Sequence, residues 1–416
     1  MRNLLMLLFL FGNVVIVNAQ NLPRATPESV GISSAGLAQV TANLQGHIDA
    51  GHIAGAVAAV LRDGKLIYLE ALGQRDIETT SAMPDDALFR IYSMTRPVTS
   101  LAAMILWEEG KFQLDDPISK YLPQFAVQRV FINPSSPDMT QTRERVGDIT
   151  VADLMRHTSG LGSRSSDIYV AEQVRLRSIT AEQLANNAAR VPLFEDPGTS
   201  FRYGLSASVL GRLVEVWSGM PYDEFLQQRV FSPLGMTDSV FWVDPSRVDR
   251  LATVYRPSSD GTLSPHEMEE MPFTEKVPLI EGGVGLLSST LDFAKFSQLF
   301  LSGGELHGRR ILQQETVTLM MQDSIAAELQ PIGSSGYMAA SGWTLGGFAY
   351  ALDPARYDHT VSQGEVWWDG SAGTRFWIDP QQGIVTVIMA QISPADGEGF
   401  REEFKNGVYE AIVERR

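Results

Sequence analysis

The stretch Ile91-Tyr92-Ser93-Met94-Thr95-Arg96-Pro97 carries most of the information on the fold and the candidate site of this chain. One helix face follows it, marked by apolar residues at helical spacing, namely Met94, Val98, Leu101, Ala102, Ile105 and Leu106. Gly110 is suited to the position just past the end of that helix. We therefore predict a buried helix with Ser93 at its N-terminus, where free N–H groups and the positive dipole end favour a developing oxyanion.

Two interpretations of Ser93 follow from this position. Serine is a common N-cap residue, so its hydroxyl could simply satisfy a backbone N–H of the helix. Alternatively Ser93 is a nucleophile, with Arg96 about one turn further on and able to share its face. The choice between them depends on two distant segments.

One segment is Pro197-Gly198-Thr199-Ser200-Phe201-Arg202-Tyr203-Gly204-Leu205, and the other is Trp367-Trp368-Asp369-Gly370-Ser371-Ala372-Gly373-Thr374. With Ser93 and Arg96, they resemble in order and spacing the three motifs of the penicillin-recognising serine enzymes. Those motifs are Ser-x-x-Lys, Tyr-x-Asn or Tyr-Ser-x, and Lys-Thr-Gly or Trp-Gly-Gly.

Four further segments extend the resemblance over most of the chain: Asp115-Asp116-Pro117, Arg156-His157-Thr158-Ser159-Gly160-Leu161, Phe231-Ser232-Pro233-Leu234-Gly235-Met236 and Glu281-Gly282-Gly283-Val284-Gly285-Leu286. The chain is similar to the serine β-lactamase and penicillin-binding-protein-like superfamily of class C type. Its motifs are closest to the β-lactamase-like carboxylesterases (family VIII esterases).

The resemblance implies a role for each motif residue. Ser93 matches the nucleophile that forms an acyl-enzyme, and Tyr203 matches the tyrosine that takes its proton and later activates water. The Ser371 N–H, with that of Ser93, matches the oxyanion hole. Trp368, Asp369 and Gly370 match the edge-strand motif that lines the substrate pocket. The implied activity is hydrolysis of a small carboxylic ester, or acyl transfer from it, without a cofactor.

Two residues depart from the family pattern. Arg96 replaces the motif lysine, and a guanidinium cannot act as a base, although its charge should lower the pKa of Tyr203. Asp369 stands where relatives usually carry Thr or Gly, and a carboxylate beside an oxyanion would oppose its formation. We hypothesise that Asp369 pairs with Arg96; the alternative is a solvated aspartate on a strand edge.

The departures leave other functions open. Trp368 occupies the place of the lysine that holds a β-lactam carboxylate, and no asparagine follows Tyr203, so an esterase is favoured over a β-lactamase or a D-amino-acid peptidase. Arg96 and Asp369 also allow a catalytically impaired member that binds a peptide, a cell-wall fragment or an acyl compound without turnover. The sequence does not specify the ester or the oligomeric state.

The two ends of the chain predict one antiparallel sheet. Apolar runs at 54–61 and 65–71 are joined by Asp63-Gly64, a tight-turn pair, and a second hairpin spans 374–378 and 384–391. Helices are expected at 36–50, at 206–216 and at 398–416, the last with Phe400, Phe404, Val408 and Ile412 on one face.

We therefore expect an α/β (α+β) fold, an antiparallel sheet flanked by helices with an inserted, mainly helical lobe. The sheet domain would comprise residues 20–110 and 281–416, and the lobe residues 111–280.

Composition restricts the partners and the compartment. Residues 1–19 read as a signal peptide, with Arg2 before an apolar run and small residues at Val17 and Ala19; a retained anchor is the alternative. The mature chain, exported to the periplasm or the medium, has no other run long enough to span a bilayer. The full sequence of 416 residues includes no cysteine and no histidine spacing typical of a metal site, and its net charge of −16 argues against nucleic acid as a partner.

Overall fold

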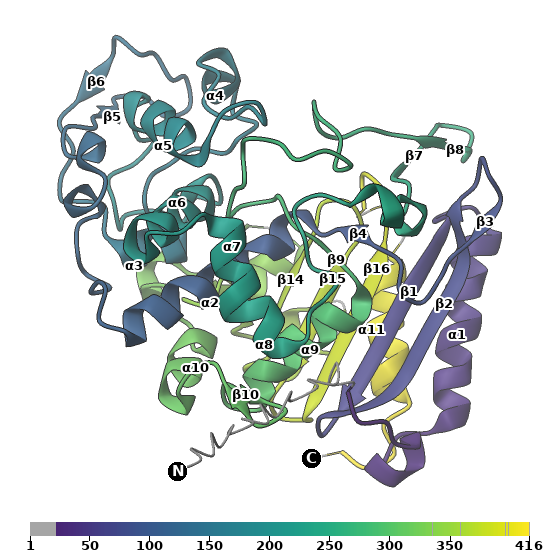
Figure 1. Ribbon diagram of the computed structural model, residues 1–416. Helices are drawn as coiled ribbons and strands as arrows, with labels where there is room; N and C mark the ends of the chain where they lie inside the picture. The colour runs from purple at the N-terminus through teal and green to yellow at the C-terminus, as the bar shows by residue number, and fades with distance from the viewer. Residues whose placement is uncertain (1–21, 335, 358, 396, 398, 416) are drawn as a thin grey trace, which may run out of the picture.

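A single antiparallel sheet forms the centre of the computed structural model, which describes residues 22–334, 336–357, 359–395, 397 and 399–415 (Figure 1). Its strands, in spatial order, are β12 (Ser341–Trp343), β13 (Ala349–Ala351), β14 (Val366–Asp369), β15 (Arg375–Asp379), β16 (Ile384–Ala390), β1 (Gly55–Arg62), β2 (Lys65–Asp76) and β3 (Ser81–Ala82). The predicted signal peptide lies outside the described residues.

The sheet is closed where the two ends of the chain meet. β1 pairs with β16 in a register running from Ala56 opposite Ala390 to Arg62 opposite Ile384. Both predicted hairpins are confirmed, and the turn between β1 and β2 has positive φ at Asp63 (54°) and Gly64 (74°), as a tight hairpin requires. β1 and β16 are buried along their whole length, which explains why they read as continuous apolar runs.

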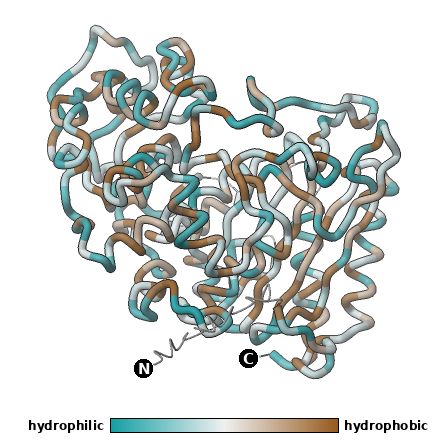
Figure 2. The backbone as a smooth tube through the Cα atoms, in the orientation of Figure 1, coloured by the Kyte–Doolittle hydropathy of each residue, from teal (hydrophilic) through white to brown (hydrophobic). Residues whose placement is uncertain are grey.

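Helices cover both faces of the sheet. Phe293 of α9 (Thr290–Leu301) contacts Phe376, whereas Phe404 of α11 (Phe400–Glu410) contacts Tyr68. The register places Phe376 in line with Leu69, the neighbour of Tyr68, so the two contacts lie on opposite faces. α1 (Ser34–Asp49) packs beside α11, and Figure 2 shows hydrophobic residues concentrated along the strands between these layers. The predicted fold class is confirmed.

The remaining elements lie mostly between β3 and β12 along the chain. The longer helices are α2 (Thr95–Glu108), α5 (Ala181–Arg190), α6 (Ser206–Ser218) and α10 (Gln314–Met321), and the shorter ones are α3 (Val151–Arg156), α4 (Asp167–Ala171), α7 (Tyr222–Leu226) and α8 (Ser232–Leu234). Two-residue or three-residue strand pairs are β4 (Phe89–Arg90) with β9 (Leu287–Ser288), β5 (Val130–Phe131) with β6 (Thr142–Arg143), β7 (Tyr255–Pro257) with β8 (Leu263–Pro265), and β10 (Glu305–Leu306) with β11 (Arg309–Arg310). The boundaries of a separate helical lobe remain a prediction.

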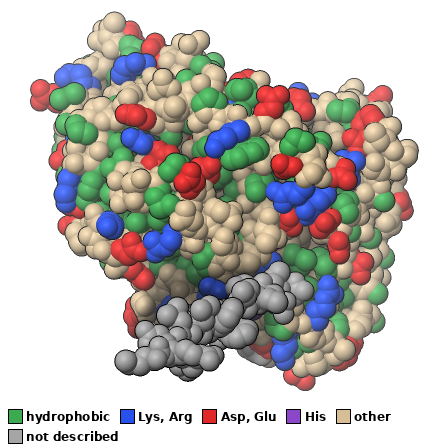
Figure 3. Space-filling model, in the orientation of Figure 1, with side chains coloured by type: hydrophobic (Ala, Val, Ile, Leu, Met, Phe, Trp, Pro, Cys, Tyr) green, Lys and Arg blue, Asp and Glu red, His purple; other side chains and the backbone are tan. Residues whose placement is uncertain are grey.

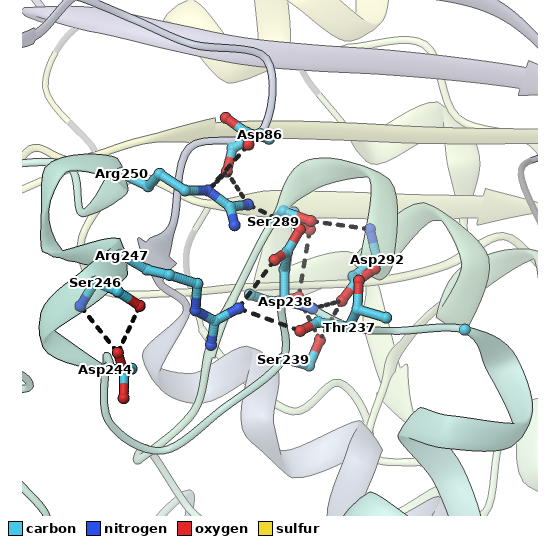
Figure 4. Close-up of polar contacts among 12 residues, drawn as sticks. Asp86, Thr237, Asp238, Ser239, Asp244, Ser246, Arg247, Arg250, Ser289 and Asp292 are labelled. Atoms are coloured by element: carbon cyan, nitrogen blue, oxygen red, sulfur yellow. Dashed lines mark hydrogen bonds and ion pairs between the residues drawn. The ribbon is translucent and has the colours of Figure 1, made fainter. Parts of the chain in front are cut away.

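A polar network fixes the segment after α8 against α9 (Figure 4). Asp238 accepts hydrogen bonds from Arg247 at 3.2 Å and forms an ion pair with Arg250 at 2.8 Å, while its backbone N–H donates to Asp292 of α9 at 2.7 Å. Ser239 also donates to Asp292. The carboxylates and guanidinium groups of this region are thus engaged with one another.

No described helix combines the length and the apolar character needed to cross a bilayer. On the face seen in Figure 3, acidic and basic side chains are interspersed rather than gathered by sign.

Candidate active site

Ser93 lies in a sharp turn at the entrance to α2. The turn comprises Tyr92 to Met94, and Tyr92 has a φ of 41°, a left-handed conformation that bulky residues rarely adopt. Burial of the Tyr92 ring, edge-on to Phe273 at 6.2 Å, holds it there. Met94 rather than Ser93 occupies the N-cap position of α2, and it makes no side-chain cap. The capping interpretation of Ser93 is therefore wrong, and the predicted helix is confirmed.

The end of β14 passes directly beside this turn. A Cβ added at Gly370 would overlap the Ile91 carbonyl and the Thr374 hydroxyl, so only glycine allows this approach. Ser371 follows at once, and its N–H donates to no backbone acceptor among the described residues. β13 pairs with β14 at Val366 and Trp367 only, which leaves the following residues as a free edge, as the motif implied.

Tyr203 contacts both motif segments. Its hydroxyl accepts a hydrogen bond from Trp368 Nε1 at 2.8 Å, and the Ser93 hydroxyl acts to lower the pKa of the phenol. Burial raises the pKa of Tyr203 above its usual value, and this effect outweighs the opposing effects of Arg96, Ser93 and Trp368. The expected effect of Arg96 is present, since its charge lowers the pKa of Tyr203, although the net shift is upward.

Arg96 is buried beneath Tyr203 with no carboxylate in ion-pair range among the described residues. Its Nη1 donates to the Gly204 carbonyl at 2.6 Å, and its guanidinium lies 4.1 Å from the centre of the Tyr203 ring. Burial lowers the pKa of Arg96. A carbonyl dipole and an aromatic face thus replace the counter-ion that a buried cation normally has.

His157 lies against the same guanidinium. It ends α3 in a left-handed conformation (φ 59°) and its Nε2 is 3.4 Å from Arg96 Nη1. Burial first, and then the charge of Arg96, hold the pKa of His157 well below its usual value, so the ring is neutral at pH 7. A neutral imidazole has one acceptor nitrogen, and the Gly204 N–H is also 3.5 Å from Nδ1. His157 therefore packs the site without adding a charge.

The hypothesis that Asp369 pairs with Arg96 is wrong. Asp369 Oδ2 accepts from Arg375 at 2.8 Å and lies 3.6 Å from Arg401 Nη1. The reason is the alternation of side chains along β14: Trp368 faces Tyr203, so its neighbour Asp369 faces α11 on the opposite side. Two guanidinium groups compensate its charge, which removes the expected repulsion of an oxyanion.

A cavity of about 480 Å³ joins these residues. Six of the seven predicted site residues line it, namely Ser93, Tyr203, Trp368, Asp369, Gly370 and Ser371. Arg96 does not line the cavity and lies behind Tyr203. Sequence reasoning missed the other lining residues, Met338, Ser393, Pro394, Ala395 and Arg401. The signal for Arg401 was available, because it is a basic residue next to the apolar stripe of the C-terminal helix.

A second cavity, of about 330 Å³, lies among Phe231, Phe241 and Trp242. Its one serine, Ser239, is only 1% exposed, and its hydroxyl is engaged with Ser288 and Asp292. Within the described part of the chain, no group of three or more potential ligands is placed to hold a metal ion. The predicted site residues thus gather at the cavity around Ser93.

Comparisons with known proteins agree with this geometry. The Beta-lactamase family matches residues 40–406. An uncharacterized protein of Mycobacterium tuberculosis is 33% identical over 357 residues, covering 83% of this chain and 88% of the relative. Esterase EstB of Burkholderia gladioli is 27% identical over 355 residues, covering 81% and 86%.

A solved structure, that of EstCE1, a hydrolase with promiscuous acyltransferase activity, has a TM-score of 0.79 at 26% identity and covers 90% of this chain and 99% of its own. The resemblance to class C β-lactamases and related esterases is thus confirmed. The chain belongs to the β-lactamase family, and its relatives include esterases and acyltransferases.

Proposed function

We propose that this protein is a serine hydrolase that cleaves small carboxylic esters through an acyl-enzyme on Ser93. The observation that carries the proposal is the placement of Ser93 and Tyr203, together with Ser371, at the wall of one cavity of about 480 Å³, which is large enough for a small ester. The esterase EstB and the hydrolase EstCE1 are relatives of the same family and support this reaction class.

The geometry supports a two-step reaction. Ser93 Oγ attacks the ester carbonyl while its proton passes to Oη of Tyr203 in its tyrosinate form, and the N–H groups of Ser371 and Ser93 stabilise the carbonyl oxygen as it gains charge. Collapse of the intermediate breaks the bond to the alcohol, which leaves with the proton from Tyr203. Water then attacks the acyl-enzyme and gives a proton to Tyr203, and that proton returns to Ser93 Oγ as the acid leaves; a second alcohol in place of water gives acyl transfer.

Arg96 restricts this reaction to one base. A guanidinium does not release its proton in this pH range, and His157 does not line the cavity, so Tyr203 is left as the proton acceptor for Ser93. Because burial raises the pKa of Tyr203, little tyrosinate is present at pH 7. We expect slow hydrolysis at neutral pH. The same two observations favour a second candidate, a family member that binds an acyl compound without turnover.

Intact-mass analysis after treatment with a fluorophosphonate separates the two candidates. We expect one adduct on the wild type and none on Ser93→Ala. Ser393→Ala is the matched control, because Ser393 lines the same cavity and has no base assigned to it, so its adduct should persist. A folded wild type that forms no adduct would contradict the hydrolase and favour the binding protein.

Export is a further part of the proposal. The pattern of residues 1–19 supports removal of a signal peptide before Gln20. Expression of the full chain in a bacterium, followed by fractionation and mass measurement, tests it. A product that keeps Met1 and stays in the cytoplasm would contradict export.

A further inference from the structure

We propose that Asp369 is a specificity-determining residue: by compensating Arg401 at the cavity wall, it keeps the site from accepting acyl groups that carry a carboxylate. The inference rests on the proposed function, because it assumes that the cavity beside Ser93 holds the acyl group.

The two residues meet at the lining of the cavity. Arg401 is in the first turn of α11, its side chain is only 3% exposed, and it is the one cation among the described lining residues. Its Nη1 is 3.6 Å from Asp369 Oδ2. Asp369 also lines the cavity and has 18% of its side chain exposed, so a ligand that approaches Arg401 also approaches Asp369.

A wider ion-pair network holds this arrangement. Arg375, 1% exposed, binds Asp369 on one side and Glu402 on the other. Burial alone would raise the pKa of Glu402, but Arg375 and Arg401 hold it below its usual value, so the network is charged at pH 7. Asp369 is the member of the network whose negative charge faces the cavity.

Charge then decides what the cavity accepts. Arg401 is the one basic side chain among the described lining residues, so it is the group to which a substrate carboxylate would be drawn. Asp369 cancels that attraction, because it lies within the same few ångströms as Arg401. The cavity therefore selects uncharged acyl groups. Removing the charge of Asp369 makes the wall more positive by one unit, whatever else Arg401 contacts.

A pair of esters that differ only at the far end of the acyl chain tests this inference. 4-Nitrophenyl valerate ends in a methyl group, and the 4-nitrophenyl monoester of glutaric acid ends in a carboxylate. For Asp369→Asn we expect the ratio of kcat/KM for glutarate over valerate to rise about tenfold, which corresponds to about 1.4 kcal/mol, the size of one unit charge at several ångströms in a partly solvated site. The change should lie in KM rather than in kcat.

Two further variants separate specificity from damage. Glu402→Gln removes the same charge from the same network but does not line the cavity, so it should keep the ratio within about twofold of wild type. Arg401→Gln should lower the ratio about tenfold. In the double variant Asp369→Asn/Arg401→Gln, the ratio should not show the rise expected for Asp369→Asn alone. Far-UV circular dichroism shows whether each variant is folded.

Binding without turnover distinguishes failure of this inference from failure of the proposed function. The same substitutions placed on Ser93→Ala allow the dissociation constants of the two esters to be measured by titration calorimetry. If the wild type hydrolyses neither ester but Asp369→Asn still shifts the ratio of dissociation constants, the hydrolase is wrong and the specificity stands. If neither Asp369→Asn nor Arg401→Gln shifts the ratio, the inference is overturned.

Discussion

Replacing Arg96 by lysine tests whether one residue limits the chemistry of Ser93. Lysine keeps the positive charge behind Tyr203 but, unlike a guanidinium, can give up its proton. Burial lowers the pKa of Arg96 itself and would do the same to a lysine there, which brings part of that lysine into its neutral, basic form. Ser93 would then have a second base within reach.

The size of the effect follows from the contacts of Arg96. The Arg96 guanidinium contacts both the Gly204 carbonyl, at 2.6 Å, and the Tyr203 ring, at 4.1 Å, and a lysine cannot make both contacts at once. A hydrogen bond from a charged donor contributes about 1.5–3 kcal/mol and an enclosed cation–π contact about 1–2 kcal/mol. The lysine ammonium recovers part of one of these two contributions. We expect the free energy of unfolding to fall by about 1–3 kcal/mol. A positioned base contributes about 10²–10⁴-fold to rate, so labelling of Ser93 should accelerate at least tenfold.

The assay is the rate of fluorophosphonate labelling at pH 7, followed by intact mass, with urea unfolding for stability. Arg212→Lys is the matched control, since Arg212 lies on α6 with Glu215 at 2.9 Å and away from the cavity lining. If Arg96→Lys folds and labels no faster than wild type, the reasoning is refuted, because base supply would then not be what limits Ser93.

Three further outcomes follow from the same geometry. The labelling rate of wild type should rise about tenfold per pH unit from 7 to 9, because only tyrosinate accepts the proton and burial holds the pKa of Tyr203 above its usual value; a plateau before pH 9 would contradict this. Tyr203→Phe should slow labelling about 10²-fold, and an unchanged rate would exclude Tyr203 as the base. Gly370→Ala should lower activity and reduce the free energy of unfolding by about 1–3 kcal/mol, because the added Cβ overlaps the Ile91 carbonyl. The control Gly46→Ala on α1, with open space around it, should stabilise the protein by about 0.5–1 kcal/mol. Equal effects of the two substitutions would show that the close approach of Gly370 to Ile91 does not matter.

The sheet could be predicted from the sequence because its hairpins are local. The Asp63-Gly64 pair specifies a turn with two positive φ values, and the apolar runs beside it have the length of strands. The pairing of β1 with β16, more than 300 residues apart, followed from the position of the two hairpins at the two ends of the chain. The short strands β12 and β13 could not be predicted in this way. Each has only three residues, which is too few to show an apolar run or an alternation in the sequence.

The site was predictable where a motif fixes spacing and unpredictable where a side-chain direction decides. Ser93, Tyr203 and Ser371 come together in the cavity as their motifs implied. The predicted Asp369–Arg96 pair was wrong because adjacent residues of a strand face opposite sides of the sheet, and Trp368 is the residue that faces Tyr203. The net direction of the Tyr203 pKa shift could not be predicted, because the sequence shows the charge of Arg96 but not how deeply the phenol is buried.

Arg96 and Asp369 are therefore two separate departures, compensated by different groups. A carbonyl and an aromatic ring surround Arg96, and Arg375 with Arg401 surround Asp369. Sites that share no partner have additive effects on stability, so a double-mutant cycle of Arg96→Lys and Asp369→Asn should give a coupling free energy below about 0.5 kcal/mol by urea unfolding. A direct ion pair between them would give a coupling of 1 kcal/mol or more. A coupling of that size would mean that the two substitutions depend on each other, and that the charge of Asp369 serves Arg96 rather than the wall of the cavity.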